Sequence, residues 1–161
     1  MSKPMITLNS NATQGHQIVK KMVQGYSCQD LNAIMPMFDD NAVYQDMVGS
    51  NEYGNTLYGV AAIRKHFTFY FKYLMPSHHY EDAIIIGEGN RICASWTLVF
   101  GTDLEESKQH RVRGCDFFLI EDGKVIEKCA FLKFSFSTYI AMVNLKLLEA
   151  LSFKSKVAPA H

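Results

Sequence analysis

The sequence has no excess of charge of either sign. Its 161 residues carry 16 Lys and Arg against 16 Asp and Glu, so the formal net charge at pH 7 is zero. A neutral chain has no overall field that attracts nucleic acid or an acidic membrane surface. We therefore expect no nucleic-acid partner and no membrane partner.

Long apolar runs are missing as well. No run approaches the roughly 20 residues that a membrane-spanning helix needs. The N-terminal stretch, MSKPMITLNSNATQG, contains no apolar core of a signal peptide. Together these absences predict a cytoplasmic protein.

Patterns typical of metal and cofactor sites are also absent. The four cysteines form no CxxC pair and are too sparse for a disulfide scaffold, and the six histidines show neither HxH nor HxxxH spacing. There is no glycine-rich phosphate loop and no Ser-His-Asp or Cys-His pattern. We expect neither a metal ion nor an organic cofactor.

Aromatic residues, in contrast, are plentiful. Eleven Phe, eight Tyr and one Trp make up 12% of the chain, which is enough to wall an apolar cavity, although aromatic side chains fill solid cores equally well. Without repeats or linkers, the length fits one domain. We assign residues 1–12 to a flexible tail, 13–134 to the domain and 135–161 to a C-terminal helical extension and tail.

Apolar residues recur at helical spacing in four segments, which lie at about 16–26, just after Asp30, at about 60–74 and at about 138–151. Asp30 is a suitable N-terminal cap for the second helix, and Pro76 ends the third. The last helix either closes over a pocket or joins a subunit contact. One face of it carries five apolar residues: Ile140, Val143, Leu147, Leu148 and Leu151.

The other segments alternate as strands do. They are AVYQDMV, YEDAIII, RICASWTLVFG, HRVRGCDFFLIE and KVIEKCAFLKF, and Asp122–Gly123 predicts a tight hairpin between the last two. Helices that come first and antiparallel strands that follow predict an α+β fold. We expect a curved antiparallel sheet with the N-terminal helices packed on its concave face, enclosing a cone-shaped pocket.

Alternation also predicts which side chains enter that pocket. Solvation of Arg111 and Arg113 on the outer face turns Asp116 and Phe118 inward. Asp46 shares a face with Tyr44. Each aspartate has a structural alternative, because Asp116 can cap a loop or pair with a lysine and Asp46 can open a turn. The neighbouring long strand turns one bulky apolar set inward: Ile92, Ala94, Trp96, Leu98 and Phe100.

The opposite face of these strands is too apolar to remain in water. We predict that a second copy of the chain covers it in a homodimer. Besides three cysteines, Cys93, Cys115 and Cys129, this face carries Val99, Phe117, Leu119 and Phe131.

Three stretches resemble the nuclear transport factor 2-like superfamily: MFDDNAVYQDMVGS, YGVAAIRKHF and RGCDFFLIEDGKVIE. Its enzyme branches include ketosteroid isomerases and SnoaL-like polyketide cyclases, and the resemblance covers about residues 16–134. It implies that Asp46 matches the general base of the isomerases and that Asp116 matches their neutral, hydrogen-bond-donating aspartic acid.

The sequence departs from the isomerase pattern at two positions. Met22 occupies the place of the oxyanion tyrosine, and Tyr26, one turn further on, is a poor substitute. Lys128 faces inward in the last strand, where it would pair with Asp116 and keep that carboxyl ionised.

Two carboxyl groups in different surroundings suit proton transfer beside a carbonyl. In the leading hypothesis Asp46 abstracts the proton and Asp116 stabilises the enolate of a hydrophobic small molecule. The alternative is a non-catalytic ligand-binding or interaction module, and a third hypothesis uses His66 or Tyr70 in a cyclase or hydrolase. His66 is either a proton shuttle at the pocket mouth or a packing residue. The expected lining of the pocket is Tyr44, Trp96, Phe100, Phe118, Met22, His66 and Lys128.

Overall fold

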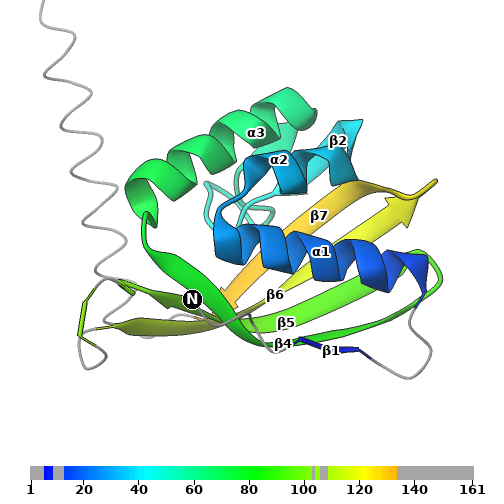
Figure 1. Ribbon diagram of the computed structural model, residues 1–161. Helices are drawn as coiled ribbons and strands as arrows, with labels where there is room; N and C mark the ends of the chain where they lie inside the picture. The colour runs from blue at the N-terminus through cyan, green and yellow to red at the C-terminus, as the bar shows by residue number, and fades with distance from the viewer. Residues whose placement is uncertain (1–5, 9–12, 103, 106–108, 134–161) are drawn as a thin grey trace, which may run out of the picture.

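The computed structural model describes residues 6–8, 13–102, 104–105 and 109–133. These residues build one curved sheet in the strand order β1-β4-β5-β6-β7-β2-β3 (Figure 1). The α+β class is confirmed. The strands are β1 (Ile6–Leu8), β2 (Phe38–Gln45), β3 (Thr56–Tyr58), β4 (His78–Glu88), β5 (Arg91–Phe100), β6 (His110–Glu121) and β7 (Lys124–Lys133).

The helices lie over one face of this sheet (Figure 1). In the described part of the chain no helix is long and apolar enough to cross a membrane. The helix predicted at 138–151 lies outside the described residues. The helical elements are α1 (Gln14–Cys28), α2 (Leu31–Ile34), the 3₁₀ turn η1 (Met35–Met37), α3 (Val60–Phe69) and the π-helical turn η2 (Tyr70–Leu74).

The sheet is mixed, which corrects the expectation of a purely antiparallel one. β2 runs parallel to β7, and β1 runs parallel to β4. A long connection that includes both helices and strands separates the two members of each pair in sequence, and parallel neighbours always need a long connection. β1 also corrects the tail, because residues 6–8 form a strand where the sequence predicts a loose segment.

The predicted alternation of β5 and β6 is confirmed. On β5 Ile92, Ala94, Trp96 and Leu98 are buried, on β6 Asp116 is buried, and the arginines of β6 are exposed. The two strands pair without interruption from Arg91 opposite Leu119 to Phe100 opposite His110, so no bulge inverts the faces. The hairpin is also confirmed, with positive φ at both Asp122 and Gly123.

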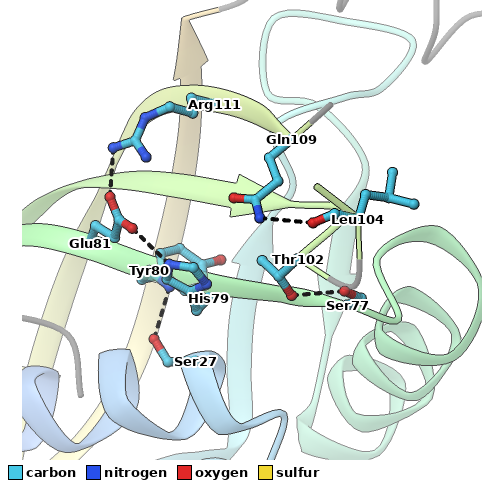
Figure 2. Close-up of polar contacts among 9 residues, drawn as sticks. All are labelled: Ser27, Ser77, His79, Tyr80, Glu81, Thr102, Leu104, Gln109 and Arg111. Atoms are coloured by element: carbon cyan, nitrogen blue, oxygen red, sulfur yellow. Dashed lines mark hydrogen bonds and ion pairs between the residues drawn. The ribbon is translucent and has the colours of Figure 1, made fainter. Parts of the chain in front are cut away.

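Side-chain contacts fix the helices on the sheet. Asp30 caps α2 as predicted, since its Oδ1 accepts hydrogen bonds from the backbone N–H groups of Asn32 and Ala33. On β4 the backbone N–H of Tyr80 donates to Ser27 Oγ of α1 (Figure 2). The bond from Tyr80 to Ser27 holds the C-terminal end of α1 against the start of β4.

His78 makes the same connection from inside the core. Its side chain is fully buried, with Nδ1 2.7 Å from the carbonyl oxygen of Met75 and Nε2 3.1 Å from that of Tyr26. Burial lowers the pKa of His78 below its ordinary value of 6.5, against the opposing effect of the two carbonyls.

This lowered pKa predicts how stability depends on pH. Below pH 6.5 the unfolded chain takes up the proton more readily than the folded chain, so the contribution of His78 to stability is lost as the pH falls. We expect the free energy of unfolding, measured by urea titration between pH 7 and pH 5, to decrease as the pH is lowered. The decrease should be steeper in the wild type than in His78→Gln. The control is His110→Gln, which replaces an exposed histidine of β6 and should keep the wild-type slope. Equal slopes in both variants would contradict the prediction.

Candidate functional site

A buried ion pair lies at the centre of the concave face. Asp116 of β6 accepts two hydrogen bonds, from Lys128 Nζ of β7 to Oδ1 at 2.8 Å and from Trp96 Nε1 of β5 to Oδ2 at 3.0 Å. The side chains of Asp116 and Lys128 are each 4% exposed. Asp116 lies directly opposite Ala94 and Ala130, whose small side chains leave space for the longer ones to reach it. Asp116 is therefore positioned as an acceptor of hydrogen bonds, which differs from the donor role that the resemblance implies.

Aromatic rings surround the ammonium group of Lys128. Its Nζ lies 4.7 Å from the ring centroid of Tyr44, 5.4 Å from that of Tyr26 and 5.7 Å from that of Phe118. All three distances are within the range in which a cation is attracted to the face of a ring. The rings exclude water from the ion pair, so that the ammonium and the carboxylate compensate each other's charge.

Asp46 follows directly after β2, near the edge of the same interior. Its Oδ1 accepts hydrogen bonds from the hydroxyl of Tyr44 at 3.1 Å and the backbone N–H of Met47 at 2.8 Å, and Oδ2 lies 3.7 Å from Nε2 of His66 on α3. The side chains of Asp46 and His66 are 10% and 19% exposed. These two residues thus form the part of the site that reaches solvent.

The loop between β2 and β3 holds Asp46 in place. The backbone N–H of Asp46 donates to the carbonyl of Asn55 at 3.0 Å. Gly54 has a φ of 69°, and a Cβ on it would lie 1.7 Å from the carbonyl oxygen of Asp46. Only glycine allows this close approach, so the glycine-bearing loop sets the position of the carboxylate.

Tyr44 joins the two halves of the site. Its hydroxyl contacts Asp46 and its ring contacts Lys128. Burial, and then the charges of Asp46 and Asp116, raise the pKa of Tyr44 well above its ordinary value, and the same causes raise that of Tyr70. Because Tyr44 contacts both Asp46 and Lys128, the partner of Asp116, the two carboxylates border one aromatic interior.

Tyr26 is the residue of this candidate site that the sequence argument undervalued. Its ring lies beside Lys128, and its hydroxyl is buried without a hydrogen-bond partner among the described residues. Burial, followed by the charge of Asp116, raises the pKa of Tyr26 well above its ordinary value, so the phenol keeps its proton. The spacing contained the signal, because residues i and i+4 share a helix face and Tyr26 follows Met22 by four.

The other expected lining residues are distributed unevenly. Met22 is fully buried on α1. Phe100, at the C-terminal end of β5, is half-buried and stacks on His110 with ring centroids 5.1 Å apart. His66 packs on Tyr44 and Tyr70. Among the described residues no group of three or more His, Cys, Asp and Glu side chains is arranged to hold a metal ion.

Three solved structures share the fold at low sequence identity. A proposed polyketide cyclase from Xanthomonas campestris pv. campestris is 17% identical over 82% of this chain and 98% of that chain, with a TM-score of 0.62. TerC, co-crystallized with polyporic acid, is 16% identical over 83% and 98%, with a TM-score of 0.60. A proposed ketosteroid isomerase from Kribbella flavida DSM 17836 is 14% identical over 76% and 80%, with a TM-score of 0.61. These similarities concern the fold.

The sequence itself matches one family. The model of the SnoaL-like domain matches residues 19–128, which include both aspartates, Tyr26 and Lys128. A comparison with curated proteins gave no match.

Proposed function

The chain belongs to the family of SnoaL-like domains, and from that premise we propose that it is a cofactor-free enzyme that transfers a proton beside a carbonyl of a small apolar molecule. The observation that carries this proposal is the Asp46 carboxylate, which is held by Tyr44 and Met47 at the solvent-reaching end of an aromatic interior. A fixed carboxylate beside apolar side chains is suited to act as a general base.

The proton leaves the substrate at the mouth of the site. Asp46 takes it from the carbon next to the carbonyl, the electron pair of the C–H bond moves into the new carbon–carbon double bond, and the carbonyl oxygen becomes an enolate. His66 lies 3.7 Å from Asp46 and is itself partly exposed. Since imidazole titrates near neutral pH, His66 is the group that passes the proton between Asp46 and water or product.

The enolate oxygen needs hydrogen-bond donors or positive charge. In the sequence hypothesis Asp116 is that donor, but both of its oxygens accept bonds in this geometry. We assign the role to the Tyr26 hydroxyl and the Lys128 ammonium, which lie on the same side of the interior. Asp116 then acts as a positioning residue that orients Lys128.

The ligand is expected to be flat, largely apolar and oxygen-bearing. The rings of Tyr26, Tyr44 and Phe118 are at most 2% exposed, so a ligand that reaches Lys128 does so after these rings shift. The co-crystal of TerC with polyporic acid supports the view that a protein of this fold takes up a small organic acid.

A second function is favoured by the ion pair. If Lys128 and Asp116 stay bonded to each other behind closed rings, the site lacks an available oxyanion donor on the sheet. The chain would then be a non-catalytic binding module on the same fold.

Deuterium exchange separates the two functions. A series of aryl ketones with exchangeable α-protons is incubated with the protein in D₂O and followed by NMR, while binding is followed by the fluorescence of Trp96, the single tryptophan of the chain. The enzyme proposal predicts exchange above the buffer rate together with a change in fluorescence. A fluorescence change without exchange would support the binding module, and no response to any member of the series would contradict both for this ligand class.

A further inference from the structure

The convex face of the sheet exposes a contiguous apolar surface, which we call the outer patch. Figure 1 shows the labelled helices on the opposite face. In the outer patch, the rings of Phe117 and Phe131 meet edge to face at 5.7 Å. A contiguous exposed apolar surface of this kind usually marks a site that another element or molecule covers. Four of its large apolar side chains are between 50% and 53% exposed, namely Ile84, Ile86, Phe117 and Phe131.

The outer patch is also hollowed. A pocket of about 360 Å³ opens in it, bordered at its rim by Arg91 and Glu127. The pocket shows that side chains from a covering element have space to enter the face. Its remaining lining consists of Ile86, Gly87, Ile92, Cys93, Phe117, Phe118, Leu119 and Cys129.

Charged side chains border the other end of the outer patch. Figure 2 shows Glu81 of β4 accepting hydrogen bonds from His79 and from Arg111 of β6. These bonds lower the pKa of Glu81. Arg113 and Lys133 are exposed and directly opposite one another on β6 and β7. The described chain leaves β7 at this charged end, next to the apolar surface.

We propose that residues 138–151 of this chain cover the outer patch as an amphipathic helix. The described part of the sheet ends at Lys133, and residues 134–161 follow it. Their spacing in the sequence places Ile140, Val143, Leu147, Leu148 and Leu151 on one face of such a helix, as an apolar stripe. This proposal does not depend on the proposed function.

The length of the proposed helix agrees with the length of the outer patch along β7. A helix over 138–151 is about 21 Å long at 1.5 Å per residue. Along β7 the stretch from Lys133 back to Glu127 is roughly 20 Å at 3.3 Å per residue. The four linking residues 134–137 reach up to about 13 Å, which allows the chain to turn back over a face that packs at about 10 Å.

The concave face is not available to this stripe. Within the described residues it is already filled by α1 and α3, whose apolar side chains Val19, Met22, Val23, Ile63 and Phe67 are buried against the sheet. The outer patch is therefore the apolar surface that remains on the described sheet. A second copy of the chain, which the sequence predicts here, is the competing occupant.

Three native cysteine thiols make it possible to measure whether the outer patch is covered. Cys93, Cys115 and Cys129 lie on the outer patch and are free and half-buried, whereas Cys28 is exposed at the end of α1. Burial raises the pKa of all three outer thiols, that of Cys93 to about 11. Their alkylation rates are thus compared between full-length variants at one pH, with Cys28 as the internal reference.

The variants are Leu147→Lys, in the apolar stripe, and Met142→Lys, which lies roughly 140° away around the helix at 100° per residue. We expect Leu147→Lys to speed alkylation of the outer thiols on the order of tenfold by shifting the equilibrium toward the open form, and Met142→Lys and the wild type to react alike. Rates for Cys28 should be equal in all three proteins. Mass spectrometry of the labelled peptides gives each rate.

Two results would overturn the proposal. Equal rates for the outer thiols in Leu147→Lys and the wild type would show that the stripe does not cover them. Protection that weakens on dilution of the wild type, in step with a falling mass in light scattering, would show that a second copy is the occupant. Circular dichroism checks that both lysine variants are folded, and the Met142→Lys control carries the same added charge.

Discussion

Lys128→Met is expected to lower the free energy of unfolding by about 3–5 kcal/mol, the usual cost of removing one member of a buried ion pair. Within the described residues the ammonium group is the charged partner of Asp116, with Nζ 2.8 Å from Oδ1. Without it the Asp116 carboxylate remains buried, with the single hydrogen bond from Trp96 as compensation. Chemical denaturation followed by circular dichroism measures the loss.

A double variant tests whether the uncompensated charge is the cause. Asp116→Asn removes that charge but keeps an oxygen for Trp96 Nε1, so Asp116→Asn combined with Lys128→Met should recover much of the lost stability. Lys65→Met, at an exposed position of α3, is the control for the loss of a lysine and should change stability by less than about 0.5 kcal/mol. A loss in Lys128→Met as small as that of the control would mean that the pair is solvated in solution.

The position of this ion pair was predictable from the sequence to a considerable extent. The runs that became β5 and β6 alternate cleanly, and two arginines identify the outer face of β6, so the inward direction of Asp116 follows from a period of two. The same argument turns Lys128 inward on β7. The contact between Asp116 and Lys128 does not follow from alternation alone. Alternation gives the face on which a side chain lies, but not which residue is its diagonal neighbour on the next strand.

Other parts of the site depend on contacts that no local pattern records. The hydrogen bond from Trp96 to Asp116 joins two strands through a diagonal pair. The indole fits there because its directly opposite neighbour is Gly114, where a Cβ would lie 2.4 Å from the Trp96 ring. The parallel placement of β2 beside β7 brings Tyr44 opposite Lys128, and a sequence that groups its strands late predicts antiparallel neighbours instead. The three residues of β3 are too few to show a period.

The two ends of the site also differ in what they require of the sequence. The ion pair needs only correct strand faces, whereas Asp46 needs the loop from Met47 to Asn55 to fold back so that Gly54 packs on its carbonyl. A glycine at positive φ is compatible with many loops, and its closing contact appears only in three dimensions. For this reason Asp46, which carries the proposed chemistry, is harder to place from the sequence than Asp116.

Asp46→Asn is expected to lower the rate of deuterium exchange by about 10²–10⁴-fold, the contribution typical of a positioned general base. The amide oxygen can still accept the hydrogen bonds from Tyr44 and Met47, so the fold and the ligand-induced change in Trp96 fluorescence should persist, and the loss should fall on kcat more than on KM. Asp40→Asn, at an exposed position of β2, the strand that precedes Asp46, is the matched control and should exchange at the wild-type rate. Exchange that survives in Asp46→Asn would exclude this carboxylate as the base and leave His66, the other ionisable side chain described at the mouth, as the group to substitute next.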